Sequence, residues 1–138
     1  MEISRDQFDR ITGNLWRERL ARALRKSVPG YGDTSQQLRD DFLTLAIDAA
    51  EAARFRTEQG AAGYVLGAWY LEPGFESRSR LLVALFASAL PEFRRLHAMN
   101  GWLEVAIREP NNVAAADDGL RKAFEMTHAW GIRAAGSN

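Results

Sequence analysis

Two histidines are the side chains of this sequence that could exchange a proton near neutral pH, so acid–base or metal chemistry would depend on them first. His97 follows Arg-Arg-Leu, and His128 follows Glu125 by three residues. Residues at that spacing share one face of a helix, so Glu125 and His128 could supply two ligands to a metal ion. The sequence has no second pair of this kind, and a structural or capping role is the preferred interpretation of both histidines.

Other catalytic motifs are missing from the sequence. Without cysteine there is no disulfide, thiolate nucleophile or cysteine-bound zinc. No serine nucleophile elbow, Walker loop or dinucleotide fingerprint is present, and Gly60, Gly63 and Gly67 do not follow a predicted strand. We therefore predict no enzyme activity, no cofactor, and no catalytic or metal-binding residue.

Four acidic side chains, Asp40, Asp41, Asp48 and Glu51, lie on a helix expected from about residue 35 to residue 55. Some of them share a face, as an acid–base pair or a cation site would need. No histidine lies near them, so surface charge is the preferred interpretation. A concentrated acidic surface would also suit an immunity protein that blocks a basic toxin.

A basic segment from residue 17 to residue 26 carries Arg17, Arg19, Arg22, Arg25 and Lys26 against a single Glu18. A nucleic-acid patch is one interpretation, and a solvated helix face is the other. Eighteen basic and eighteen acidic residues balance over the whole chain, so no global field attracts nucleic acid. We prefer the solvated face and predict no nucleic-acid partner.

The element expected to organise these side chains is a helix over about residues 57–71, capped by Thr57 and without a charge from Ala61 to Leu71. A strand is the alternative, but no partner strand is apparent. Because the helix is apolar on nearly all sides, other helices must surround it, with Gly60, Gly63 and Gly67 allowing one of them to approach closely. It is shorter than the roughly 20 apolar residues that span a bilayer, so no membrane partner is predicted.

The flanking segments predict further helices. A capping box at Ser4 opens the first, which ends at Val28-Pro29-Gly30. The second, from residue 35 to 55, should bury a stripe of Leu38, Phe42, Leu45 and Ala49, broadened by Ala46, Ile47 and Ala50. Later helices start at Ser77 or Ser79, near Pro91 with Phe93 buried, and near Val113, ending at Gly131. Whether the helix of residues 91–108 continues through Asn100 stays open.

Together these patterns predict an all-α fold, a compact bundle of about five to six helices around the apolar helix. Residues 1–131 should form a single helical domain, and residues 132–138 a flexible tail. The charged N-terminus is unlike a signal peptide, so a cytoplasmic location is expected.

A set of residues over roughly the first 80 positions also forms a pattern. An opening Ile3-Ser4-x-x-Gln7-Phe8 leads to Arg19-Leu20 and Leu24-Arg25 before Pro29, then to Leu38-Arg39, Ile47, the segment Arg56-Thr57-Glu58-x-Gly60-x-Ala62-x-Tyr64-Val65-Leu66, and Phe75. This pattern resembles a family of small helical proteins encoded beside VgrG-type spike and PAAR-tip genes of bacterial type VI secretion systems.

The resemblance implies an accessory role without catalytic residues: a co-chaperone or adaptor that helps to load a secretion effector. The implied partner is an effector, an effector chaperone or a PAAR or VgrG component, and a homo-oligomer stays open. An aromatic and arginine rim on the first helix and a loop aromatic make Trp16, Arg19, Arg22 and Phe75 the predicted partner-binding residues. The alternative is an immunity protein that neutralises a cognate toxin by direct binding.

Overall fold

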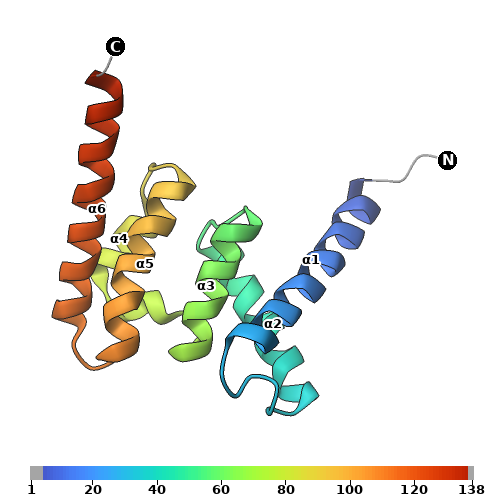
Figure 1. The fold of residues 1–138 in the computed structure, drawn as a ribbon. Coiled ribbons are helices and arrows are strands. Elements are labelled where there is room, and N and C mark those ends of the chain that lie inside the picture. The colour runs from blue at the N-terminus through green and yellow to red at the C-terminus, as the bar shows by residue number, and fades with distance from the viewer. Residues whose placement is uncertain (1–4, 137–138) are drawn as a thin grey trace. The chain divides into compact units, whose positions relative to one another are not determined.

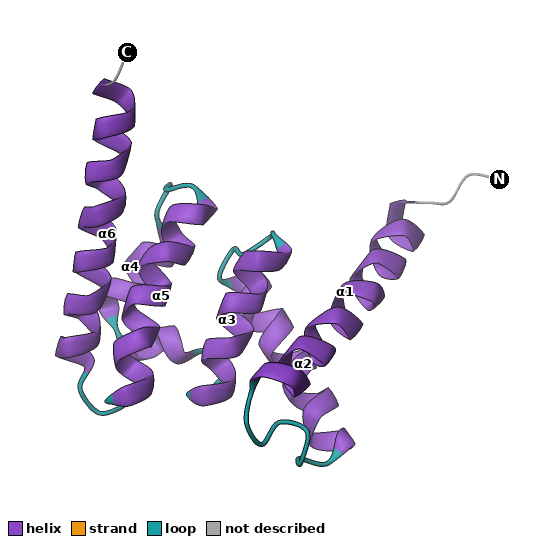
Figure 2. Ribbon diagram, viewed as in Figure 1, coloured by secondary structure: helices purple, strands orange, loops and turns teal. Residues whose placement is uncertain are grey.

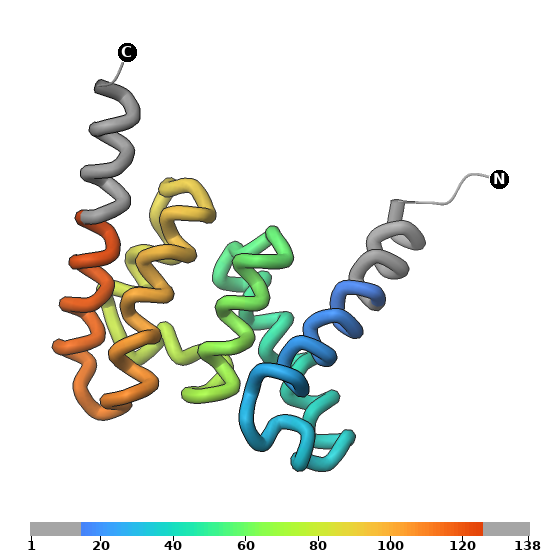
Figure 3. Tube along the Cα trace, viewed as in Figure 1, coloured from blue at the N-terminus to red at the C-terminus, as the bar shows by residue number. Residues whose placement is uncertain are grey.

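The computed structural model describes residues 5–136, and the side chains of residues 15–125 (coloured trace in Figure 3). Over this range the regular structure is entirely helical, without a strand (Figures 1 and 2). In chain order the elements are α1 (Arg5–Ser27), α2 (Gln36–Ala52), α3 (Glu58–Tyr70), the 3-10 helix η1 (Phe75–Arg78), α4 (Arg80–Ala87), α5 (Glu92–Arg108) and α6 (Val113–Gly136). The predicted all-α class and small helical bundle are confirmed.

The helices belong to two compact units, Met1–Leu45 and Ala46–Asn138. The single domain over residues 1–131 and the flexible tail over 132–138 stay predictions. Within the described residues α6 continues to Gly136, so the last helix runs past its expected end at Gly131. None of the described helices combines the length and the apolar character needed to cross a bilayer.

The buried side chains of the first unit come from α1, the loop that follows it, and α2. They are Leu20, Leu24, Val28, Tyr31 and Leu43. α1 ends where the sequence predicts, since the Val28 N–H donates to the Leu24 carbonyl at 2.8 Å and Gly30 then turns the chain with a φ of +82°. The capping box expected at Ser4 lies outside the described residues.

The second helix ends earlier than expected. α2 stops at Ala52 rather than near residue 55, because Arg54 takes a left-handed φ of +69°. The Phe55 N–H then donates to the Ala50 carbonyl at 3.0 Å, and the Phe55 ring enters the core. The turn that follows α2 therefore places the Phe55 side chain in the core.

The centre of the buried stripe predicted for α2 is wrong, whereas Ala46 and Ala50 at its edge are buried as predicted. Leu38 is 61% exposed and Leu45 is 62% exposed, while Phe42 and Ala49 are half-buried. The side of α2 that is buried carries Leu43, Ala46 and Ala50 instead. Both sides of this helix are apolar, and the side with the smaller residues is buried because it allows closer packing.

α3 begins at its predicted cap, where the Thr57 hydroxyl oxygen accepts a hydrogen bond from the Gly60 N–H at 3.0 Å. Tyr64, Val65 and Ala68 are buried, but Leu66 and Tyr70 are exposed. The expectation that other helices cover α3 on nearly all sides is therefore wrong for the face of Leu66 and Tyr70, which are one helical turn apart.

The three glycines of α3 confirm the predicted close approach of a neighbouring helix. A Cβ atom would lie 2.5 Å from the Glu92 carboxylate if built on Gly60, 2.8 Å from Leu96 Cδ1 on Gly63, and 2.7 Å from the Leu103 methyl groups on Gly67. These partners advance along α5 in the same order as the glycines, so α3 and α5 run parallel (Figure 1).

α4 starts at Ser79, one of its two predicted starts, and α5 is continuous from Glu92 to Arg108 through Asn100. Phe93 was expected in the core, but it is 66% exposed. The buried side of α5 carries Arg95, Met99, Trp102 and Leu103 among others, so the first turn of this helix presents its aromatic ring to solvent.

Aromatic rings form the centre of the second unit. Phe86 meets Phe55 edge to face with ring centroids 5.3 Å apart, and Phe75 stacks on Tyr64 at 4.8 Å and on Trp102 at 5.9 Å. Such pairs contribute about 0.5–1.5 kcal/mol each beyond the area they bury.

One carboxylate of α6 ties two other helices to this core. Asp117 Oδ1 accepts hydrogen bonds from the Ser79 hydroxyl at 2.7 Å and from the Trp102 indole N–H at 2.9 Å. Ser79 Oγ in turn accepts from the Leu82 N–H at 3.1 Å, which caps α4. Asp117 thus holds the start of α4 and the middle of α5 at once.

Candidate functional site

The exposed side of α1 carries a row of mostly cationic residues. Leu15, Arg19, Arg22 and Lys26 follow one another at spacings of four, three and four residues, which places them on one face. All four are exposed, Leu15 to 53%. Arg19 and Arg22, with the half-buried Trp16 beside them, are of the residue types most often found at the energetic centres of protein interfaces.

Arg17 lies between this row and α2 and has an internal role. Its guanidinium donates to the Asp40 carbonyl and to the Thr44 hydroxyl, both at 2.9 Å. The Thr44 hydroxyl donates to the same carbonyl at 3.0 Å. These bonds fix the middle of α1 beside the middle of α2.

Three apolar residues of α2 form the α2 stripe: Leu38 and Leu45, which are exposed, and Phe42, which is half-buried. They stand at spacings of four and three residues, so they lie on one side of the helix. Asp41 is exposed and directly precedes Phe42 in the sequence. Its carboxylate accepts a hydrogen bond from the Gln37 side-chain amide at 3.0 Å. An apolar stripe with a polar border is typical of a protein-binding surface.

The fourth predicted binding residue, Phe75, has a different place. Its ring is fully buried between Tyr64 and Trp102. Contact with a partner through Phe75 stays untested as a prediction, but its side chain is part of the core in this structure. Trp16, Arg19 and Arg22 are brought together on α1, and Phe75 belongs to the second unit.

The candidate acid–base and metal residues are scattered. His97 is exposed on α5, Glu125 is exposed on α6, and the side chain of His128 lies outside the described residues. Asp48 and Glu51 of α2 are also exposed. Among the residues with described side chains, no three acidic or histidine groups are placed to hold a metal ion.

A polar network that the sequence did not reveal joins the starts of α3 and α5. The Glu92 carboxylate accepts hydrogen bonds from the Arg56 N–H at 2.5 Å, the Thr57 N–H at 3.1 Å and the Thr57 hydroxyl. Burial alone would raise the pKa of Glu92, but these three donors outweigh it and lower the pKa below its ordinary value. The carboxylate therefore caps α3 from another helix.

Arg95 is buried next to this carboxylate without forming an ion pair with it. The guanidinium donates to the carbonyls of Leu90 at 3.1 Å, Ala53 at 3.3 Å and Arg54 at 3.0 Å, and lies 5.3 Å from the Phe55 ring centroid. Burial and the charge of Arg54 lower the pKa of Arg95. These partners are backbone carbonyls and an aromatic ring, so the Arg95 guanidinium has a structural role.

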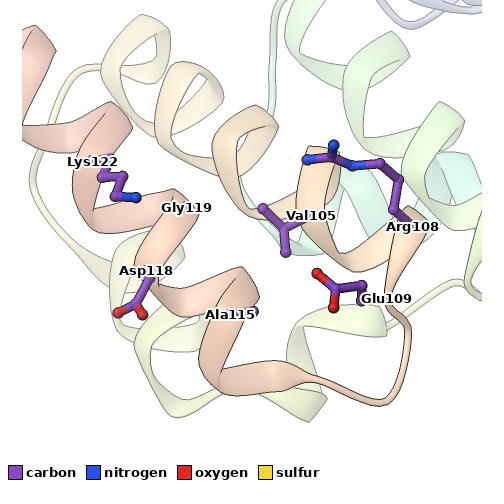
Figure 4. A pocket seen from close by; sticks show the side chains of 7 residues that line it. All are labelled: Val105, Arg108, Glu109, Ala115, Asp118, Gly119 and Lys122. Carbon is purple, nitrogen blue, oxygen red and sulfur yellow. The ribbon is translucent and has the colours of Figure 1, made fainter.

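A pocket of about 560 Å³ lies between the end of α5 and the first turns of α6 (Figure 4). It is lined by Val105, Arg108, Glu109, Ala115, Asp118, Gly119 and Lys122. Asp118 pairs with Arg121 at 2.9 Å, and Arg108 Nε donates to the Glu104 carbonyl at 3.0 Å. The lining offers charges of both signs but no hydroxyl or imidazole.

Comparison of the chain with protein-family models, with curated proteins and with solved structures finds no match.

Proposed function

We propose that this chain is a non-enzymatic protein-binding accessory factor that uses the surface of α1 and α2. The observation that carries the proposal is the exposure of Leu38 and Leu45 on one side of α2. Full burial of a leucine side chain is worth about 1.5–3 kcal/mol, so a partner that covers both gains considerable affinity. Trp16, Arg19 and Arg22 of α1 are further candidates, because tryptophan and arginine favour protein recognition.

The proposed partner follows from the resemblance over roughly the first 80 residues. On the basis of this resemblance, the proposed role is that of a co-chaperone or adaptor that helps to load a type VI secretion effector. The partner would be that effector, its chaperone or a PAAR or VgrG component. The α2 stripe supports protein binding, and the resemblance alone supports this choice of partner.

The test is co-expression of the tagged chain with the products of its neighbouring genes, followed by affinity capture. A Leu38→Ser/Leu45→Ser variant should lose capture by at least about tenfold, because each tenfold corresponds to about 1.4 kcal/mol. A Leu66→Ser/Val83→Ser variant removes two exposed apolar side chains of the second unit and is the matched control. Loss of capture in the control but not in the α2 variant would contradict the proposed surface.

The immunity protein is the second candidate, because all four acidic side chains of α2 (Asp40, Asp41, Asp48 and Glu51) are exposed. Such a surface could cover the basic active site of a nuclease toxin. Replacement of the four by Asn and Gln should then abolish protection of cells that express a neighbouring toxin gene. Protection that survives this replacement would exclude binding through the acidic side chains.

A further inference from the structure

The pocket between α5 and α6 follows from the way in which the two helices pack. They approach closely at Gly101 and Gly119, where neither residue has a side chain to separate the backbones. Crossing helices move apart on either side of such a contact, and the short side chain of Ala115 leaves the space beside Val105 unfilled (Figure 4). The resulting volume of about 560 Å³ lies within the range of roughly 300–1,000 Å³ that is usual for small-molecule sites.

Three ionised groups in the lining have no partner of opposite charge among the described side chains. They are the exposed guanidinium of Arg108, carboxylate of Glu109 and ammonium of Lys122. Nε of Arg108 donates to a carbonyl of its own helix at 3.0 Å, which leaves the two terminal nitrogens for a ligand. The fourth charged residue of the lining, Asp118, is already paired with Arg121 at 2.9 Å. The unpaired groups are therefore two cations and one anion.

These three groups flank a floor without charge. Figure 4 shows Arg108 and Glu109 at one end of the pocket, where α5 ends, and Lys122 at the other end, on α6. Val105 and Gly119 lie between the two ends and offer only hydrocarbon and backbone. The pocket thus presents a cation and an anion together at one end and a second cation at the other.

We propose that this pocket binds a peptide of two or three residues that begins with an acidic residue. Its N-terminal ammonium pairs with Glu109, its acidic side chain with Arg108, and its C-terminal carboxylate with Lys122. The peptide backbone covers the floor, and each ionised group of the lining meets an opposite charge. A free amino acid would leave much of the volume empty, so a short peptide is the better match in size.

This proposal is independent of the proposed function. The pocket lies in the second unit, and none of its lining residues belongs to α1 or α2. Peptide binding is measured on the purified chain, and partner capture is measured with the neighbouring gene products, so either proposal can fail without the other.

The test is calorimetric titration of the full chain with the tripeptide Asp-Ala-Ala and with three probes that each lack one of its charges. The probes are the N-acetylated peptide, the peptide with Asn in place of Asp, and the C-terminally amidated peptide. Each probe should bind the unaltered chain about fivefold more weakly than Asp-Ala-Ala, which is the upper range for an exposed ion pair. Equal affinity for all four peptides would overturn the proposal, as would no binding of Asp-Ala-Ala.

Variants of the lining assign each charge of the peptide to one residue. Glu109→Gln should bind the acetylated and the free peptide equally, because the ammonium has lost its partner. In the same way Arg108→Gln should no longer distinguish Asn from Asp, and Lys122→Met should no longer distinguish the amide from the acid. Each variant should keep its preference at the other two positions. Preferences that persist in all three variants would overturn the assignment and the site.

Two further variants separate the pocket from the rest of the surface. Ala115→Phe places a ring on the pocket floor and should abolish binding, while circular dichroism checks that the helices are retained. Arg80→Met removes an exposed cation of the same unit outside the pocket and should bind all four peptides like the unaltered chain. Binding that survives in folded Ala115→Phe, or that is lost in Arg80→Met, would overturn the proposal.

Discussion

Gly101 of α5 and Gly119 of α6 meet backbone to backbone. A Cβ atom built on Gly101 would lie 2.7 Å from the Gly119 carbonyl oxygen, and one built on Gly119 would lie 2.6 Å from the Gly101 carbonyl oxygen. Real Cβ atoms do not approach backbone this closely, so the crossing of α5 and α6 depends on the missing side chain at both positions.

Replacement of either glycine by alanine should destabilise the second unit. Gly101→Ala and Gly119→Ala gain up to about 1 kcal/mol of helix propensity, but separating two packed helices costs about 1–3 kcal/mol. Gly63→Ala is the matched control, because its new methyl group would come too close only to Leu96 Cδ1, the end of a flexible side chain, and would be in ordinary contact with Met99 Cε at 3.5 Å. Urea unfolding should show a lower free energy of unfolding for Gly101→Ala and Gly119→Ala. Gly63→Ala should show a smaller decrease, or an increase.

Arg95→Met should lower the free energy of unfolding by about 2–4 kcal/mol, because it leaves the carbonyls of Leu90, Ala53 and Arg54 without this donor in a buried place. Arg94→Met, at the adjacent half-buried position, should stay within about 0.5 kcal/mol of the unaltered chain. Thermal or urea unfolding of both variants measures the difference. Equal effects would mean that the carbonyl contacts of Arg95 do not stabilise the fold.

The Glu92 carboxylate should make stability depend on acidity. Its pKa in the folded chain lies below the ordinary value of 4.5, so its contribution is fully present above that value and is lost as the pH falls through the folded pKa. The unaltered chain should therefore have a higher free energy of unfolding than Glu92→Gln at neutral pH, and this difference should disappear between about pH 5 and pH 3. A stability difference that stays constant over this range would show that the charge of the carboxylate is irrelevant to the cap.

Phe75→Ala should cost about 3–5 kcal/mol, because it removes the fully buried ring between Tyr64 and Trp102. Phe93→Ala removes the same atoms from a side chain that is 66% exposed and should cost less than about 1 kcal/mol. Urea unfolding gives both values. If Phe75→Ala kept its stability and lost partner capture, its predicted role as a direct partner contact would be supported instead.

Signals carried by neighbouring residues were sufficient to predict several features of the fold. Thr57 and Ser79 cap the helices that follow them, because a cap needs only a hydroxyl and the N–H three residues later. The glycines of α3 predicted a close neighbour, although not which helix it would be. Such features depend on spacing along one element.

Features that depend on two elements were missed. Glu92 looks like an ordinary first-turn acid, and nothing in its neighbours along the chain indicates that it caps α3. The predicted burial of α2 was centred on the wrong side, since Leu38 and Leu45 give as regular a pattern as Leu43 and Ala46. The side of a two-sided apolar helix that enters a core is decided by fit with its neighbours, which local periodicity does not contain.

The double acceptor role of Asp117 has a consequence for synthesis on the ribosome. The Ser79 hydroxyl and the Trp102 indole both donate to the Asp117 carboxylate. Asp117 lies 38 residues after Ser79 and 15 residues after Trp102, so it is synthesised after both donors. A nascent chain that has released α3, α4 and α5 from the exit tunnel still lacks this acceptor. We therefore expect the aromatic centre of the second unit to become native only after the first turns of α6 emerge from the tunnel.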